Sequence, residues 1–227
     1  MPSDSLKWIG IALALGGPVV MVAARHRFLG ARPPAVQRTW TSIIMWLLVA
    51  AILLICVLGE RRPLASLGFG DLGWLTWGWG AAIGAAGIAL FPLYVLLSRA
   101  LGLPVPDKGQ LESLIRLPAA VRLLVLATAA GTEEILFRGY AITRLQETTG
   151  SPWLAGGISL VLFVLAHMQA WGLGHLIYVA AAGLVLTAPF VLRGDLWSNI
   201  IGHAIVDAVP LLLLPLAALR QPAAGKA

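Results

Sequence analysis

The feature that most constrains this chain is a succession of long apolar segments separated by short polar connections. A membrane-spanning helix takes about 20 consecutive apolar residues, and lipid forces each span to satisfy its own backbone hydrogen bonds. The pattern therefore predicts an all-α fold, a polytopic transmembrane helical bundle of about seven to eight spans. The seven segments are Trp8 to Ala24, Trp40 to Gly59, Trp74 to Leu97, Ala119 to about Gln146, Trp153 to about His167, Leu173 to Leu192 and Leu196 to Leu219.

The composition supports a membrane protein and leaves little room for anything else. Hydrophobic residues make up 59% of the 227 residues and charged residues only 11%, whereas soluble domains have about 25% charged residues. We therefore predict a single integral membrane domain over residues 1–227, located in the cell (inner) membrane. The expected partner of its surface is membrane lipid.

The basic residues are distributed as topology signals and not as a nucleic-acid-binding patch. They lie at the edges of the apolar segments, so the net charge of +6 predicts no nucleic-acid partner. With seven spans, the side shared by the first connection and the C-terminus holds most of them, which predicts an outside N-terminus and a cytoplasmic C-terminus. The residues on that side are Arg25, Arg27, Arg32, Arg38, Arg99, Lys108, Arg116, Arg122, Arg220 and Lys226, against Lys7, Arg61, Arg62, Arg144 and Arg193 on the other.

The stretch AAGTEEILFRGY, residues 129–140, places two adjacent carboxylates in an apolar helix. Glu134 and Arg138 are four residues apart, so they are neighbours on a helix and can form an ion pair. Glu133 lies about 100° further round the helix and has no basic residue within reach on it. A buried carboxylate without a partner is costly in a bilayer, and an intramembrane ionisable residue is a functional-site candidate.

Two further polar pairs occur in later spans. FVLAH places Phe163 and His167 on one helical face, and HAIVD does the same for His203 and Asp207. Peptide hydrolysis needs a base for water, a donor for the oxyanion and a proton for the leaving amine. If the three polar faces converge, Glu133 with His167 could activate water. His203 with Asp207 could then hold either an oxyanion or a metal ion.

The three motifs together resemble those of a known family. EEILFR resembles the Glu-Glu-x-x-x-Arg motif of the type II CAAX prenyl endopeptidases and their bacterial relatives, the CAAX-processing and bacteriocin-processing (CPBP) intramembrane proteases. FVLAH resembles the family's Phe-x-x-x-His motif and HAIVD its His-x-x-x-Asn/Asp motif, in the family's order. The resemblance covers residues 119–210, which we predict to be the catalytic helices. It implies a helical membrane bundle with endopeptidase activity at a site between helices.

The resemblance also implies roles for individual residues. Glu133 corresponds to the first glutamate of the family's pair and would be the base, assisted by His167. Two other residues would stabilise an oxyanion or contact a metal: His203 and Asp207. An orienting or structural role falls to three residues: Glu134, Arg138 and Phe163.

The resemblance leaves the use of a metal open. The family is usually described as metalloproteases, although a metal-free mechanism with glutamate and histidine activating water is also proposed for it. His167, His203 and a carboxylate, Asp207 or Glu133, would make a catalytic zinc set with an open position. The His-Glu-x-x-His motif of common zinc proteases is absent. An ionised Asp207 would repel an oxyanion, so that role requires its protonated form or a cation.

The substrate and one alternative class of function also stay open. The family reading predicts a membrane-associated peptide or lipidated protein as substrate, including one with a prenylated C-terminus. The alternative is a non-catalytic membrane scaffold or immunity-type protein, or an ion-coupled transporter that uses the buried acids. A Gly-x-Ser-x-Gly-like nucleophile and a second aspartate well inside a span are both absent, which disfavours serine and aspartyl intramembrane proteases.

Overall fold

The computed structural model describes residues 2–104, 108–168 and 173–214, and these ranges contain helices and no strand. The predicted all-helical membrane bundle is thus confirmed. The α-helices are α1 Pro2–Leu29, α2 Pro34–Leu54, α3 Trp74–Leu101, α4 Lys108–Ile115, α5 Ala119–Thr128, α6 Thr143–Thr149, α7 Pro152–His167, α8 Leu173–Arg193 and α9 Leu196–Ala208. The π-helices are η1 Ile55–Gly59, η3 Ala129–Ile142 and η4 Val209–Leu213, and η2 Leu64–Leu67 is a short 3₁₀-helix.

All seven predicted segments are helical where they are described, but they differ in how well they suit a membrane crossing. Within the described part of the chain, five stretches are long and apolar enough: Asp4–Leu29, Pro34–Gly59, Trp74–Leu101, Gly174–Arg193 and Leu196–Leu213. The continuous helix over 119–149 carries the glutamate pair and several arginines, and α7 has only 16 residues. The predicted end of the last segment, Leu219, lies outside the described residues.

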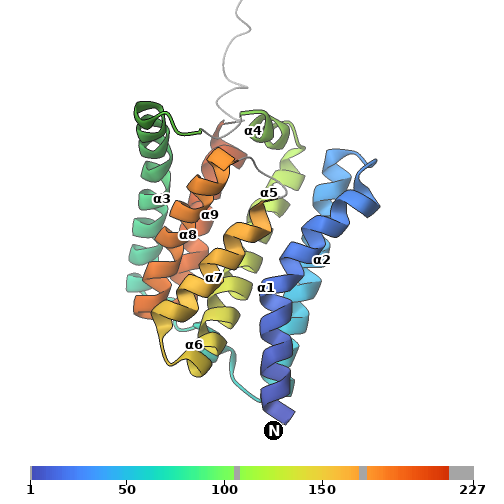
Figure 1. The fold of residues 1–227 in the computed structure, drawn as a ribbon, viewed down its shortest axis with the longest axis vertical. Coiled ribbons are helices and arrows are strands. Elements are labelled where there is room, and N and C mark those ends of the chain that lie inside the picture. Colours follow the sequence, from blue (N-terminus) through green and yellow to red (C-terminus); the bar gives the residue numbers. More distant parts are fainter. Residues whose placement is uncertain (1, 105–107, 169–172, 215–227) are drawn as a thin grey trace, which may run out of the picture.

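The helices run up and down the bundle, so their connections gather at its two ends (Figure 1). The α1–α2 connection, the end of α3 and the short helix α4 lie at one end, which we call the α4 end. The N-terminus and α6 lie at the opposite end, which we call the α6 end. The arrangement brings the predicted basic connections, among them Arg32, Arg38 and Arg99, to the α4 end.

Helices α3 and α9 approach each other closely along a line of glycines. A Cβ added to Gly80 would lie 2.6 Å from the Ile201 side chain, and one added to Gly84 would lie 2.6 Å from that of Ile205. Small residues at this spacing let two helix backbones pack tightly in a membrane. The glycines of α3 thereby set the position of α9, the helix that carries His203.

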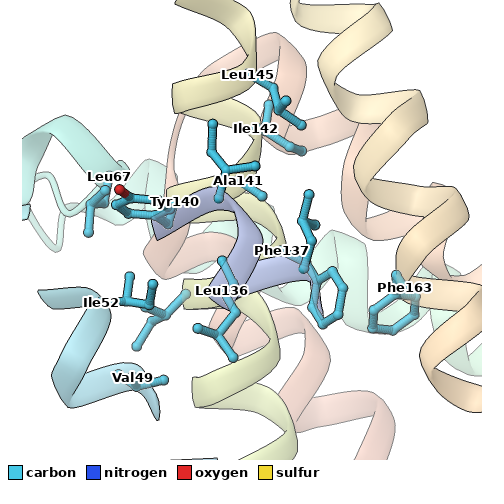
Figure 2. Close-up of a cluster of buried hydrophobic side chains, with 14 of the residues drawn as sticks. Val49, Ile52, Leu67, Leu136, Phe137, Tyr140, Ala141, Ile142, Leu145 and Phe163 are labelled. Atoms are coloured by element: carbon cyan, nitrogen blue, oxygen red, sulfur yellow. The ribbon is translucent and has the colours of Figure 1, made fainter. Parts of the chain in front are cut away.

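The buried core surrounds η3, which lies between helices on several sides. Figure 2 shows Phe137 of η3 facing Phe163 of α7, with Leu136 on the side of α2. The rings of Phe137 and Phe163 meet edge to face, with their centroids 5.2 Å apart. Among the largest fully buried side chains are several of η3, including Leu136 and Tyr140. This burial holds the glutamate pair near the centre of the bundle.

The glutamate pair lies on a π-helix, where the sequence pattern indicates an α-helix. Thr132 Oγ1 donates to the carbonyl of Thr128 at 2.7 Å, and Thr143 Oγ1 donates to that of Gly139 at 2.6 Å. Threonine hydroxyls that bind the carbonyl four residues back compete with backbone N–H groups for that acceptor. A wider helical turn satisfies those N–H groups one residue further back, and π-helical turns often occur at functional sites.

A second polar network lies toward the α6 end. Arg144 is only 1% exposed and its Nε donates to Glu60 Oε2 at 2.8 Å, while its NH2 group donates to Ser66 Oγ at 2.9 Å. The Tyr140 hydroxyl donates to the other carboxylate oxygen of Glu60 at 2.7 Å. Arg144, which the sequence places among the basic residues of a connection, is therefore a buried partner that ties α6 to the segment after α2.

Candidate active site

Glu134 is the centre of a buried polar cluster. Its side chain is 0% exposed, and three side chains from two helices bind its carboxylate. Arg138 NH1 donates to Oε1 at 3.0 Å, and His203 Nδ1 lies 2.8 Å from the same oxygen. Asn199 Nδ2 donates to Oε2 at 3.1 Å. A buried carboxylate needs partners of this kind to offset the loss of water, and here both of its oxygens are used.

Arg138 links Glu134 to the neighbouring helices. The predicted ion pair between the two side chains is present, and Arg138 is itself only 1% exposed. Its NH2 group donates to the carbonyl of Gly183 in α8 at 3.2 Å. Its guanidinium carbon lies 4.4 Å from the centroid of the Phe163 ring, a cation–π contact with α7. These contacts suit the orienting role that the resemblance implies for Glu134, Arg138 and Phe163.

His203 lies between two carboxylates. Its Nδ1 faces Glu134, and its Nε2 lies 3.7 Å from Asp207 Oδ2, one turn further along α9. Because the Glu134 carboxylate can only accept, Nδ1 carries the hydrogen of this bond. The Asp207 side chain is 26% exposed, against 0% for Glu134. The Nε2 side of His203 is therefore the more open side.

Glu133 and His167 lie on two different helices, η3 and α7. Glu133 is only partly buried, and no side chain in the described ranges forms an ion pair with it. Glu133 adjoins Glu134 on η3, while His203 and Asp207 lie one turn apart on α9. The described structure thus brings His203 and Asp207 together beside Glu134, and the catalytic placement of Glu133 and His167 stays a prediction.

His167 is the last residue of α7, and its ring has a defined hydrogen bond. Its Nδ1 lies 2.8 Å from the carbonyl oxygen of Phe163. A carbonyl oxygen only accepts hydrogen bonds, so Nδ1 is the donor and Nε2 is left as the basic nitrogen of a neutral ring. The backbone carbonyl one turn back along α7 thus fixes the tautomer of the neutral His167 ring.

Two partners in the cluster were not singled out from the sequence. Asn199 lies four residues before His203, so Asn-x-x-x-His-x-x-x-Asp places three polar side chains on one face of α9. That spacing could have identified Asn199. The sequence could not identify the carbonyl of Gly183 as a partner of Arg138. This contact depends on where the backbone of α8 lies in the folded bundle and not on a side chain.

The described residues do not assemble a metal centre. In the ranges that the structure covers, no group of three or more His, Cys, Asp or Glu side chains could hold a metal ion. The sequence-based zinc set of His167, His203, Asp207 and Glu133 stays a prediction.

Comparison with known proteins adds one match. A family model matches residues 115–209, and its description is "Type II CAAX prenyl endopeptidase Rce1-like". This range includes all three motifs and the polar cluster around Glu134. No curated protein and no solved structure matches the chain.

Proposed function

We propose that this integral membrane protein hydrolyses a peptide bond with a water activated by glutamate and histidine. The proposal is supported by the match of residues 115–209 to the family model of the type II CAAX prenyl endopeptidases, which are intramembrane endopeptidases. The observation that carries the proposal is the polar cluster in which the fully buried Glu134 binds His203 one turn from Asp207, with Glu133 next to Glu134 on η3.

Glu133 is the proposed base. General-base catalysis needs a carboxylate that can accept a proton, and Glu133 has no ion-pair partner in the described part of the chain. Glu133 takes a proton from the water, whose oxygen attacks the peptide carbonyl carbon. His167 Nε2 accepts a second hydrogen bond from that water and orients it. The proton on Glu133 then passes to the leaving amine as the C–N bond breaks.

His203 is the proposed oxyanion donor. In the proposed step His203 is the doubly protonated imidazolium, with its Nδ1–H bound to the Glu134 carboxylate. The Nε2–H bond of that imidazolium donates to the oxyanion as the carbonyl is attacked. Asp207 stands beside Nε2 and assists the oxyanion in its protonated form, since an ionised carboxylate would repel it.

The proposed substrate is a peptide held at the membrane. A site surrounded by apolar helices suits a membrane-associated or lipidated protein, and a prenylated C-terminal tail is one substrate class of this kind. The cell (inner) membrane is the proposed location, and its lipids are the proposed surroundings of the bundle. A metal is no part of the proposed steps.

The test compares protein termini across the membrane proteome of cells that express matched amounts of three proteins: the wild type, Glu133→Gln and Glu112→Gln. Glu112 is exposed on α4, so its variant is the control for the same chemical change away from the site. New N-termini and shortened C-termini should appear with the wild type and Glu112→Gln and be missing with Glu133→Gln. Identical termini in all three samples, with each protein folded, would instead support a scaffold or transporter.

A further inference from the structure

Asn199 is a buried polar residue that the proposed steps do not use. It lies on α9 one turn before His203 and is 0% exposed. Its Nδ2 donates to Glu134 Oε2 at 3.1 Å and to the carbonyl of Leu186 in α8 at 2.7 Å. Its own carbonyl oxygen, Oδ1, is buried without a hydrogen-bond partner in the described structure. Leaving an acceptor unpaired is costly, so stability alone does not account for an amide here.

The two carboxylate oxygens of Glu134 have different hydrogen-bond partners, and Asn199 is the partner of Oε2. Oε1 accepts from Arg138 and His203, and Oε2 accepts from Asn199. Without a donor at Oε2, the carboxylate could rotate about its last side-chain bond and change which oxygen meets His203. The second hydrogen of the Asn199 amide is bound to α8, which fixes the amide itself.

Asn199 also suits this task because it is neutral. Glu134 already has a guanidinium and an imidazole beside it. A third basic residue would add a buried positive charge, and a carboxylate would repel Glu134. An amide supplies a donor without changing the charge of the cluster, so the attraction between Glu134 and His203 keeps its full strength.

We propose that Asn199 is a positioning residue that acts through Glu134: it holds the carboxylate in the rotation that binds His203 Nδ1, and thereby fixes the imidazole with Nε2 directed to the side of Asp207. The effect on turnover rests on the proposed endopeptidase function. The effect on the histidine ring does not, so the two can fail separately.

The first experiment measures the ring directly. The full chain is labelled with ¹⁵N-histidine, and the ring nitrogen signals of His203 are followed by NMR in the wild type, Asn199→Leu and Ser198→Ala. Ser198 is buried next to Asn199 but binds Asp195 at the start of α9, so its variant is the matched control. Asn199→Leu should shift the Nδ1 signal away from that of a strongly hydrogen-bonded N–H, and Ser198→Ala should leave it unchanged. An unshifted Nδ1 in Asn199→Leu would overturn the proposal.

The second experiment measures turnover on a substrate identified by terminus mapping. In Asn199→Leu, kcat should fall roughly ten- to a hundredfold, the effect of losing a hydrogen bond to a charged group. KM should stay within about twofold, because Asn199 is buried and does not meet the substrate. The positioning role would be contradicted if kcat stayed within twofold of the wild-type value. It would also be contradicted if KM changed ten- to a hundredfold while kcat did not change. A wild type without peptidase activity would refute the proposed function and leave the NMR result to decide about Asn199.

Asn199→Asp provides a variant of nearly the same shape in case the leucine disrupts folding. An ionised aspartate has no donor and repels Glu134, whereas a protonated one has an O–H group that can donate to Oε2. Turnover of Asn199→Asp should therefore be low at alkaline pH and recover toward the wild-type value as the pH falls. A pH profile parallel to that of the wild type would contradict the proposal.

Discussion

At the scale of single residues, two glutamates adjacent in sequence have opposite surroundings. Glu134 is 0% exposed and binds Arg138, Asn199 and His203. Glu133 is partly buried and has no ion-pair partner in the described ranges. Both oxygens of Glu134 accept hydrogen bonds, so Glu134 would lose some of these bonds if it took a proton from water. Glu133 can take a proton without breaking an ion pair. This difference is the reason for assigning the base to Glu133.

Changing each glutamate to glutamine should therefore affect a different property: turnover for Glu133 and stability for Glu134. Glu133→Gln should lower kcat by roughly a hundred- to ten-thousandfold and leave thermal unfolding in detergent unchanged. Glu134→Gln should instead cost about 3–5 kcal/mol of stability, because Arg138 loses its buried partner. Unfolding curves and turnover of both variants measure these effects. Wild-type turnover in Glu133→Gln would refute the assigned base.

Asp207 distinguishes an oxyanion site from a metal site. Asp207→Asn should keep turnover within about tenfold of the wild type, because an amide can donate to an oxyanion and carries no charge that repels it. Turnover and bound zinc should be measured on the same preparations. A larger loss of turnover together with loss of zinc from the variant would make Asp207 a metal ligand.

At the scale of helices, hydropathy and motif spacing in the sequence predict the helices and the contacts within one helix. They do not predict the π-helix or the contacts between helices, which depend on how individual hydrogen bonds form. Apolar runs predict the helices because lipid burial requires them, and motif spacing predicts the pair of Glu134 and Arg138. The π-helix η3 was not predicted, because threonine hydroxyls and backbone carbonyls compete locally without changing hydropathy. The bond between Glu134 and His203 joins residues 69 positions apart. No spacing within one helix can indicate such a contact.

The close approach of α3 and α9 links packing to the site. Gly84→Leu should lower stability by about 1–3 kcal/mol, the usual cost of overpacking, because a Cβ there would lie 2.6 Å from Ile205. It should also lower turnover, since α9 carries His203 and Asp207. Gly78→Leu on the same helix is the control, because a Cβ at Gly78 meets nothing within 4 Å. Thermal unfolding in detergent should separate the two variants, and equal midpoints would show that α9 does not depend on this contact.

At the scale of the whole molecule, the two ends of the bundle differ in charge. Basic residues in the first connection and around α4 lie at the α4 end, while Arg144 at the other end is buried in its ion pair with Glu60. Lys7 and Arg62 at the α6 end both lie against Glu147. The bias toward the α4 end supports the predicted cytoplasmic side. Helix α7 runs from the α6 end toward the α4 end and ends at His167, short of the level of α4 (Figure 1).

Cysteine labelling in intact cells tests this orientation. The native Cys56 is 0% exposed and should not react with a membrane-impermeant maleimide. Ala31→Cys lies in the exposed α1–α2 connection and Thr148→Cys on the exposed part of α6. Because basic connections stay in the cytoplasm, Thr148→Cys should be labelled in intact cells and Ala31→Cys only after permeabilisation. The reverse pattern would place the α4 end on the outside of the cell.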